Sequence, residues 1–372
     1  MHVERLTLYD FRNYEQLELT PAPTINVLYG QNGAGKTNIL EALHLIGLGR
    51  SHRAARDAEM VRTGAAAYRI SATVARRQAS LTIELTYRAS GRKEIRLNAA
   101  RQRRLSDLLG QFNVIVFSPE DLQLIKGSPV LRRRYLDFAL SQISPAYGHA
   151  LARYNEALLQ RNNLLRDLGG PRASSAVLDV WDEQLAEHGA ELLTRRAAAM
   201  TRIAALAAAE HDRITNGQEQ LIAAYAPSPA GCFSDVDRAT ARDALLRAIV
   251  ETRREDVLRG QTLVGPHRDD IHLRINGRNG RQFASQGQQR TAALALKLAE
   301  LAYIAAAVHD DPVLLLDDVF SELDDSRRGC LLATISDRIQ TFITTTNLNA
   351  LKQSAAPAAV FCVAAGRVER EQ

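Results

Sequence analysis

A glycine-rich segment at residues 30–37 constrains the fold of this chain more than any other feature. It reads GQNGAGKT and matches the phosphate-binding pattern G-x-x-x-x-G-K-[ST] without a break. Residues 24–29 precede it as an apolar strand, and residues 38–48 follow it with apolar positions at helical spacing. This order places backbone N–H groups and a helix N-terminus around a phosphate. The segment predicts a nucleotide-binding α/β fold, and the alternative is an ordinary glycine turn.

The pattern assigns a role to each part of the loop. Lys36 is expected to reach the β- and γ-phosphates and to assist catalysis, and the Thr37 hydroxyl is expected to bind Mg²⁺. The expected nucleotide contacts are Gly30, Gln31, Asn32, Gly33, Ala34, Gly35, Lys36, Thr37 and Asn38.

A second acidic motif completes this expected site. Residues 313–318 read VLLLDD, an apolar strand that ends in two carboxylates. Parallel α/β sheets bind ligands at the carboxyl ends of their strands, so both acids should reach the phosphates. Asp317 is a candidate Mg²⁺ partner, and Asp318 could orient or deprotonate the attacking water. The alternative is a helix N-terminus with acids that the helix dipole favours.

Size and charge leave the broad class open. The chain has 372 residues, a net charge of +5 and an isoelectric point near 9.2, which allows a nucleic-acid partner without proving one. No 18-residue apolar run or signal peptide is expected, and the three cysteines lack metal or redox spacing. We expect a cytoplasmic protein without a membrane partner.

The texture of the sequence divides the chain. We expect an ATPase head from residues 1–118 and 260–372 and an inserted helical lobe at 119–259, where alanine- and leucine-rich helical patterns replace strand signals. The helices expected there include 147–168 and 177–210. The expected strands are 3–11, 67–75, 80–87, 94–98, 113–117, 270–275, 313–316 and 341–345, with a hairpin of 360–364 and 367–369.

Two later segments resemble the ATP-binding-cassette ATPases. Ser285 opens a helix at the sequence SQGQQ, and Asp324 closes the sequence SELD after the acidic strand. The resemblance implies that Ser285 and Gly287 of one protomer close over the γ-phosphate held by another, with Asp324 nearby. ATP would then join two head-to-tail protomers. The alternative for Ser285 is an ordinary helix N-cap.

The order of short motifs across nearly the whole chain resembles the RecF family, in the chromosome-maintenance branch of that superfamily. The motifs are DFRN at 10–13, GQNGAGKTN at 30–38, LIGLGR at 45–50, FSPEDL at 117–122, GSP at 127–129, RRRYLD at 132–137 and GPHRDD at 265–270. The lobe is too short for a long coiled coil. The resemblance implies an ATP-dependent homodimer that binds DNA at gaps and stalled replication forks. It would act with RecO and RecR to promote RecA loading on single-stranded DNA and SOS induction.

The resemblance also places an arginine of the first motif near the nucleotide. Arg12 is the candidate, and the alternative is a surface arginine. His267 and Arg268 are expected to contact the ATP interface or the lobe, or to form a plain turn.

Arginine clusters are the candidates for contacting DNA. They would bind phosphates with little sequence preference, on a duplex or a single-strand/duplex junction. A solvated basic face is the alternative. The candidates are Arg101, Arg103, Arg104, Arg132, Arg133, Arg134, Arg253 and Arg254.

Departures from the cassette pattern predict a slow, DNA-stimulated ATPase that works as a switch. Gln286 stands where many cassettes have glycine, Asp318 replaces the usual glutamate, and residues 345–347 read TTN where a switch histidine is expected. The competing hypotheses are a transporter ATPase subunit and a regulatory module that does not hydrolyse nucleotide. The chain lacks the base-reading motif of a GTPase.

Overall fold

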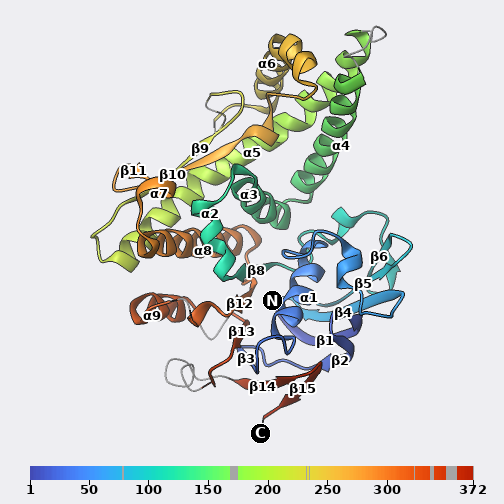
Figure 1. Cartoon of the computed structure of the whole chain (residues 1–372), viewed down its shortest axis with the longest axis vertical. Helices are drawn as coiled ribbons and strands as arrows, with labels where there is room; N and C mark the ends of the chain where they lie inside the picture. The colour runs from blue at the N-terminus through green and yellow to red at the C-terminus, as the bar shows by residue number, and fades with distance from the viewer. Residues whose placement is uncertain are drawn as a thin grey trace. The chain divides into compact units, whose positions relative to one another are not determined.

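The structure is a computed structural model in which the chain forms two compact units (Figure 1). The first unit contains Met1–Asp121 and Glu300–Gln372, and the second contains Leu122–Ala299. The described residues are 1–77, 79–167, 175–231, 233, 235–321, 323–335, 339–348 and 358–371.

A mostly parallel sheet forms one layer of the first unit. Its strand order is β15-β14-β3-β13-β12-β8, and only β15 runs antiparallel to its neighbour. Every residue of β13 and four of the five residues of β12 are buried. Such continuously buried strands are typical of a parallel sheet covered on both faces. The bounds are β3 (Ile25–Tyr29), β8 (Val114–Phe117), β12 (Val313–Asp317), β13 (Thr341–Thr345), β14 (Ala359–Ala364) and β15 (Arg367–Arg370).

An antiparallel sheet forms a second layer of the same unit, with the order β2-β1-β4-β5-β6-β7. Buried and less buried residues alternate along β4 and β5, as expected for strands with one face on a core. The bounds are β1 (His2–Phe11), β2 (Tyr14–Leu19), β4 (Ala67–Ala75), β5 (Ser80–Arg88), β6 (Arg92–Leu97) and β7 (Ala100–Arg101).

Helix α1 (Lys36–Leu48) joins the two layers. It contacts β4 and β5 of the antiparallel sheet and β8, β12 and β13 of the parallel sheet. Its buried side chains share one hydrophobic core with both sheets. The position of α1 is therefore fixed by packing against both sheets. The first unit also contains α9 (Asp325–Thr334).

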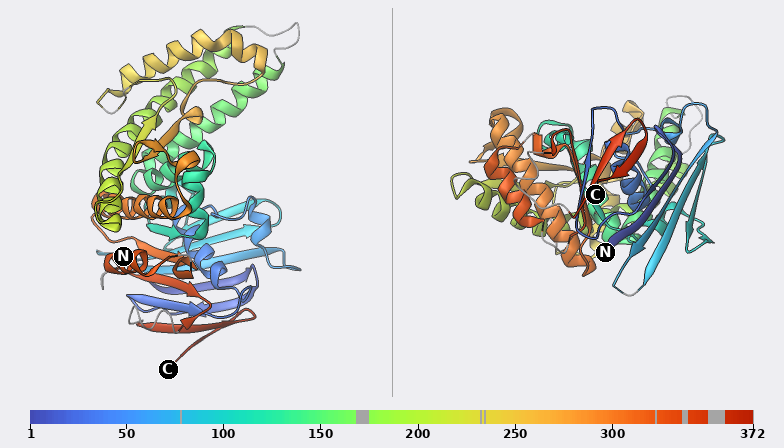
Figure 2. Two further views of the ribbon diagram at one scale, coloured as in Figure 1. Left: turned by 60° about the vertical axis from the view of Figure 1, so that its left-hand side comes forward. Right: turned by 90° about the horizontal axis from the view of Figure 1, so that it is seen from below.

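The second unit is largely helical (Figure 2). Helices α4 and α5 pack against each other, α6 packs on α5, and a three-stranded sheet of order β11-β10-β9 packs on α5 through β9. Helix α8 continues through the boundary into the first unit. The bounds are α2 (Gln123–Lys126), α3 (Pro129–Ile143), α4 (Pro145–Asp167), α5 (Ser175–Thr215), β9 (Leu221–Ala226), α6 (Arg238–Arg259), β10 (Asp270–Ile275), β11 (Arg278–Asn279), α7 (Gly280–Phe283) and α8 (Gln286–Val308).

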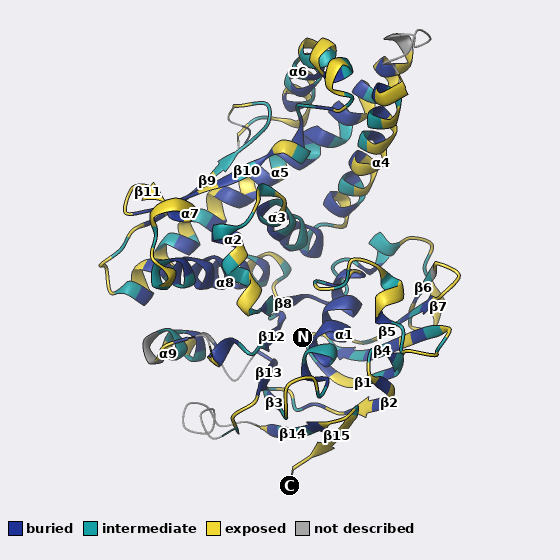
Figure 3. Ribbon diagram, in the orientation of Figure 1, coloured by how far each residue is buried: buried dark blue, intermediate teal, exposed yellow. Residues whose placement is uncertain are grey.

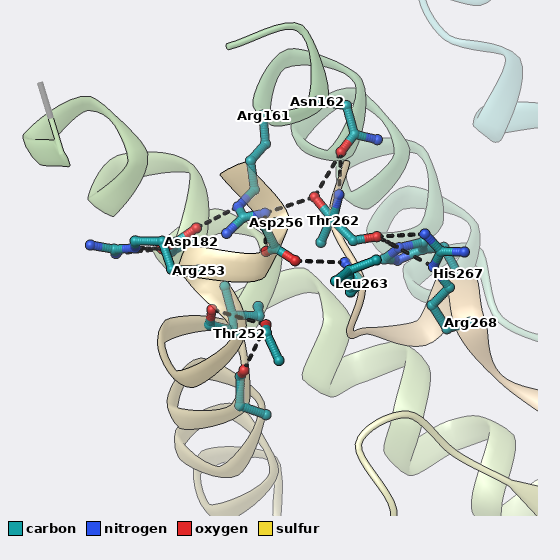
Figure 4. Close-up of polar contacts among 12 residues, drawn as sticks. Arg161, Asn162, Asp182, Thr252, Arg253, Asp256, Thr262, Leu263, His267 and Arg268 are labelled. Carbon is teal, nitrogen blue, oxygen red and sulfur yellow. Dashed lines mark hydrogen bonds and ion pairs between the residues drawn. The ribbon is translucent and has the colours of Figure 1, made fainter. Parts of the chain in front are cut away.

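A buried ion-pair network joins three helices of this unit (Figure 4). The guanidinium group of Arg161 on α4 donates to Asp182 on α5 at 2.6 Å and to Asp256 on α6 at 2.7 Å. It also donates to the Thr262 hydroxyl at 2.8 Å. Arg161 and Asp256 are both fully buried. Burial raises the pKa of Asp256, although the Arg161 guanidinium opposes this shift. Removing one member would leave a buried charge without compensation.

The structure differs from the sequence-based expectations in two places, and one expected helix end cannot be compared. Strand β9 lies in the region where only helices were expected. Its alanine-rich sequence has a weak preference for the strand conformation, and it forms a strand because it pairs with β10. Residues 260–299 group with the second unit, whereas the sequence assigned them to the head. Leu168, the last residue of one expected helix, lies outside the described residues. The expected strands, including the terminal hairpin, are confirmed.

One helix also tests the expectation about membrane segments. Among the described residues, α8 alone is long and apolar enough to cross a membrane by length and composition, although the sequence analysis expected no such run. Of its apolar window, 67% is buried inside the protein. This burial is what the core helix of a globular protein shows.

Candidate nucleotide-binding site

The glycine loop connects β3 to α1 and closely approaches other backbone segments. A Cβ atom on Gly30 would lie 2.1 Å from the carbonyl oxygen of Val363 on β14. Gly35 has φ 116°, and a Cβ atom there would lie 2.5 Å from the Asn13 side chain. Both positions therefore require glycine for steric reasons.

The end of the first hairpin holds the loop in place. The Asn13 amide donates to the carbonyl of Ala34 at 2.9 Å, and the Tyr14 hydroxyl donates to the carbonyl of Gly35 at 3.0 Å. The Asn38 amide donates to the side-chain oxygen of Asn13 at 2.8 Å. The sequence analysis noted the asparagine of the DFRN motif but did not assign it this role.

Lys36 bends back over the loop that precedes it. Its ammonium group donates to the carbonyl of Gly30 at 2.7 Å and to the carbonyl of Gln31 at 2.9 Å. The residue is only 8% exposed. Burial lowers the pKa of Lys36, while the carboxylates of Asp318 and Asp317 oppose this shift. A phosphate would give the ammonium group an anionic partner in place of neutral carbonyls.

Thr37 and Asp317 meet at the edge of the parallel sheet. The Thr37 hydroxyl donates to Oδ1 of Asp317 at 2.7 Å, and the Thr344 hydroxyl on β13 donates to the same oxygen at 2.8 Å. Two neighbouring ligands of an octahedral Mg²⁺ ion lie roughly 2.9 Å apart, given Mg–O distances near 2.1 Å. The observed spacing of Thr37 and Asp317 therefore fits a shared Mg²⁺ ion.

The protein supplies only part of a metal shell. Among the described residues, no group of three or more His, Cys, Asp or Glu side chains could hold a metal ion. Mg²⁺ usually keeps several waters and binds phosphate oxygens together with one or two carboxylates. Thr37 and Asp317 fit an ion that arrives with a nucleotide, and the remaining ligands would be phosphates and water.

Asp318 adopts an unusual backbone conformation beside them. Its φ is 52°, in the left-handed region that few residues other than glycine occupy. Its backbone N–H donates to the Thr344 hydroxyl at 2.9 Å, and its carbonyl accepts from Ser321 at 2.7 Å. These contacts hold the strand end and place the Asp318 side chain at the site.

A cavity of about 180 Å³ joins the loop and the acidic strand. Its lining includes both acids and two residues that were not expected from the sequence, Thr344 and Arg53. Arg53 is exposed and lies 16 positions beyond Thr37 without any motif around it, so only the fold reveals it. The full lining is Asn32, Gly33, Gly35, Lys36, Thr37, Asn38, Arg53, Asp317, Asp318 and Thr344.

A buried carboxylate supports the segment that carries Arg53. Glu41 lies one helical turn after Thr37 and is fully buried. It accepts a hydrogen bond from Ser51, whose hydroxyl oxygen accepts from the backbone N–H groups of Arg53 and Ala54 at 3.0 and 2.8 Å. Burial disfavours the carboxylate, but hydrogen bonds from Arg12 and Ser51 outweigh it and lower the pKa of Glu41.

Arg12 has a different environment from the one expected. Its guanidinium group donates twice to Glu41, at 2.8 and 2.7 Å, and once to the carbonyl of Glu59 at 2.8 Å. It does not line the cavity. In this arrangement Arg12 supports Glu41, and a direct nucleotide contact would require these bonds to break.

Two of the residues carried over from the cassette signature, Ser285 and Asp324, are helix caps. Ser285 and Gln288 cap the start of α8 reciprocally, with bonds of 3.2 and 2.9 Å. Asp324 caps α9 by accepting from the backbone N–H of Arg327 at 2.9 Å. Gly287 lies in the first turn of α8. Their roles at a nucleotide remain predictions.

Several arginines expected to contact DNA are occupied inside the second unit. Arg132 is 7% exposed and forms a two-bond ion pair with Asp270, at 2.6 and 3.0 Å. Arg133 donates to the carbonyl of Asp269 at 2.6 Å. Arg132 is therefore not an exposed cation available to DNA in this structure, because helical spacing turns its side chain into the core. Arg134 stacks over Phe138 at 4.9 Å.

Of the remaining arginine candidates, one is held in ion pairs and the others are exposed. Arg253 forms ion pairs with Asp182 and Asp179, so its charge is already balanced. Its neighbour Arg254 is exposed. Arg101, Arg103 and Arg104 are exposed on the first unit.

The histidine of the GPHRDD motif is a partly buried, neutral group. One ring nitrogen contacts the Tyr154 hydroxyl at 2.7 Å. The other contacts the carbonyl of Thr262 at 3.0 Å (Figure 4). Burial lowers the pKa of His267 to about 4. Arg268 donates to the same carbonyl at 2.9 Å. Both residues hold the turn against the helices of the second unit.

Comparisons with known proteins agree with this geometry. The model of the RecF/RecN/SMC N-terminal domain matches residues 2–369. The protein named DNA replication and repair protein RecF from Halalkalibacterium halodurans is 42% identical over 372 residues, 100% of both chains. Proteins of the same name from Symbiobacterium thermophilum and Heliobacterium modesticaldum are 44% identical, over 99% of this chain and 98% of theirs, and 45% identical, over 100% and 99%.

Solved structures give the same result. A structure of the recombination mediator protein RecF with ATPrS covers 100% of this chain and 98% of its own, with 33% identity and a TM-score of 0.92. An SMC head bound to a ScpA domain is 15% identical with a TM-score of 0.55, over 100% of this chain and 97% of its own, and shares the fold. The chain belongs to the RecF family of DNA replication and repair proteins.

Proposed function

We propose that this protein is an ATP-dependent DNA-binding clamp of recombinational repair in the cytoplasm. ATP with Mg²⁺ binds the cavity between the glycine loop and the acidic strand, and two protomers close around DNA gaps and stalled forks. RecO and RecR are its partners in promoting RecA loading on single-stranded DNA and SOS induction. Slow hydrolysis then releases the clamp.

The convergence of Lys36, Thr37 and Asp317 on one cavity carries this proposal. The three side chains come from the loop and from a strand that lies 280 residues later. They supply the ammonium group, the hydroxyl and the carboxylate that Mg-nucleotide binding requires. A solved structure of the recombination mediator protein RecF-ATP, 33% identical to this chain, supports the same nucleotide.

The small volume of the cavity supports a site completed by a second protomer. A cavity of about 180 Å³ is below the usual volume of small-molecule pockets, about 300 Å³ or more. A whole nucleotide would therefore extend beyond it. Ser285 and Gly287 at the start of α8 are our candidates for the partner's contribution, because a helix N-terminus attracts phosphate.

The test is the mass of the protein in solution with ATP, with ADP and without nucleotide, with and without DNA. We expect a monomer without ATP and a dimer with ATP. Ser285→Arg should abolish dimerisation while each chain still binds ATP. An exposed residue of the same helix end, Gln286, provides the matched control Gln286→Arg, which tests whether bulk and charge alone prevent association.

Two results would reject the proposal. A protein that stays monomeric in ATP does not form the clamp. ATP turnover that is fast without DNA, measured by phosphate release, is incompatible with a switch. A transporter subunit would instead copurify with membrane partners.

A further inference from the structure

The segment from β10 to α7 in the second unit carries three arginines beside an exposed phenylalanine. Arg274 lies on β10, Arg278 on β11, and Arg281 and Phe283 on α7. We call these four residues the arginine–phenylalanine surface. All four are exposed, Phe283 to 66%, and the ribbon of this segment is largely coloured as exposed in Figure 3. None of the four is among the arginines that the sequence predicts to contact DNA.

The surface has a concave shape. Arg274, Arg278 and Phe283 line an open hollow of about 430 Å³ together with Gly277 and Asn279. Gly277 has φ 75° and forms the tight turn between β10 and β11, which brings the arginines of the two strands to one rim. A hollow of this kind can receive a flat group that an exposed ridge could not.

Charge on this surface is not balanced. Residues 271–299 contain no aspartate or glutamate. Within the described part of the chain, the guanidinium groups of Arg274, Arg278 and Arg281 form no ion pair or hydrogen bond. Arginines on α6 differ, since Arg238 and Arg242 pair with glutamates of α5. Neighbouring uncompensated cations repel one another, so this surface gains free energy from a polyanion.

Positive charge alone does not account for this surface, because it also contains the exposed ring of Phe283. Its ring is largely in water beside the guanidinium groups, and an isolated polyanionic backbone would not cover it. Unpaired bases stack on aromatic side chains while arginines hold the adjacent phosphates. Bases within a duplex are already stacked on their neighbours. The combination therefore favours nucleic acid with unpaired bases over blunt duplex.

The surface adjoins the start of α8. Only Ala284 separates Phe283 from Ser285, the N-cap of α8. The Gln289 amide also donates to the carbonyl of Gly280 at 3.0 Å, which ties α7 to α8. A DNA strand bound at Phe283 would therefore lie close to Ser285 at the start of α8.

We propose that the arginine–phenylalanine surface binds single-stranded DNA, with phosphates on Arg274, Arg278 and Arg281 and an unpaired base stacked on Phe283. This inference rests on the proposed function, because it assigns part of the DNA contact to a defined surface. It also identifies the preferred DNA as one with a single-stranded stretch. Helix α7 connects this surface to Ser285, our candidate for the contact with the partner's nucleotide.

The test measures binding of the full-length protein, in ATP, to three labelled DNAs: a gapped duplex, a single strand and a blunt duplex. One variant replaces Arg274, Arg278 and Arg281 with alanine, and the other is Phe283→Ala. The controls are Arg259→Ala and Leu258→Ala, which change an arginine already paired with Glu255 and an aliphatic side chain that is 79% exposed. ATP-dependent association, measured on the same samples, reports whether the nucleotide site is intact.

The triple variant should lower the slope of log affinity against log salt by about 2, because single strands release about 0.7 counterion per neutralised phosphate. Phe283→Ala should weaken binding to the single strand and the gapped duplex by about 5- to 100-fold, leave the salt slope unchanged and hardly affect blunt duplex. Phe283→Trp should restore binding.

Three outcomes would overturn the proposal in different ways. Wild-type DNA binding with unchanged binding in both variants would remove this surface from the DNA interface and leave the clamp function standing. A wild type that binds none of the three DNAs would overturn the clamp function as well. Equal losses on all three DNAs after Phe283→Ala would reject base stacking.

Discussion

The hydroxyl of Thr37 donates a hydrogen bond of 2.7 Å to Oδ1 of Asp317, a residue 280 positions later in the chain. The parallel sheet creates this contact, because β3 and β12 both pair with β13 and end at the same edge. The two oxygens have the spacing of neighbouring Mg²⁺ ligands. The hydrogen bond therefore holds the geometry that a metal ion would use.

Replacing Asp317 should separate metal-dependent from metal-independent ATP binding. We expect Asp317→Asn to weaken ATP binding in Mg²⁺ by at least about tenfold, since even indirect support of a metal ligand is worth about 10- to 100-fold. In EDTA the variant and the wild type should bind alike. Titration with a fluorescent ATP analogue measures both. Ser321→Ala, near Asp318 but away from the metal, is the control, and an equal loss in EDTA would contradict a metal role.

Glu41→Gln should weaken ATP binding indirectly, because Glu41 does not line the cavity but supports the segment that carries Arg53. The amide can accept only part of the hydrogen bonds that Arg12 and Ser51 donate, so the segment leading to Arg53 should loosen. We expect a higher KM for ATP and an unfolding free energy lower by about 1–3 kcal/mol. Arg53→Ala is the matched variant. It should raise KM to a similar degree without lowering stability, and a normal KM in both would exclude this route.

Asp318→Asn tests the proposed base. Asparagine tolerates the positive φ of this position, so the backbone should not change. We expect kcat to fall by about 10²–10⁴-fold, the usual contribution of a general base, with ATP affinity and ATP-induced dimerisation retained. Phosphate release and solution mass measure the two effects. An unchanged kcat would show that another group activates water.

Local sequence patterns were sufficient for most of the fold and for the centre of the site. The strand at 341–345 and the loop at 30–37 follow from alternation, apolar runs and glycine spacing, which act between near neighbours. Strand β9 could not be found this way, because its alanines form a strand only when paired with β10. Its position depends on a partner about 50 residues away.

Side-chain environments were less predictable than elements. In the run at 132–134, one arginine is buried against Asp270, one binds a backbone carbonyl and one stacks on a ring. A charge count treats the three as equal, whereas the helical period turns each in a different direction. Arg53 shows the opposite error, since a residue without a motif was brought to the cavity by Glu41 and Ser51.

Arg132→Ala should therefore act on stability and not on DNA. It removes one partner of a mostly buried ion pair and leaves Asp270 without its cation. We expect a loss of about 3 kcal/mol in the free energy of unfolding, at the low end for a buried pair because Asp270 is partly exposed. The salt dependence of DNA binding should not change. Arg103→Ala, at an exposed position, should have the reverse pattern if the first unit contacts DNA.

His267 should make the second unit less stable in mild acid. Burial lowers its pKa from 6.5 to about 4, so between these values the unfolded chain takes up a proton that the folded protein does not. Above pH 6.5 this group hardly affects the free energy of unfolding. As the pH falls from 6.5 towards 4 the free energy of unfolding decreases, and at pH 5 this group alone has lowered it by about 2 kcal/mol. Urea denaturation at pH 7 and pH 5 measures the difference. His267→Gln should be less stable at both values, because it disturbs the contacts to Tyr154 and Thr262, but its loss between them should be smaller by this amount. A variant with the same pH dependence as the wild type would show that His267 takes up its proton while folded.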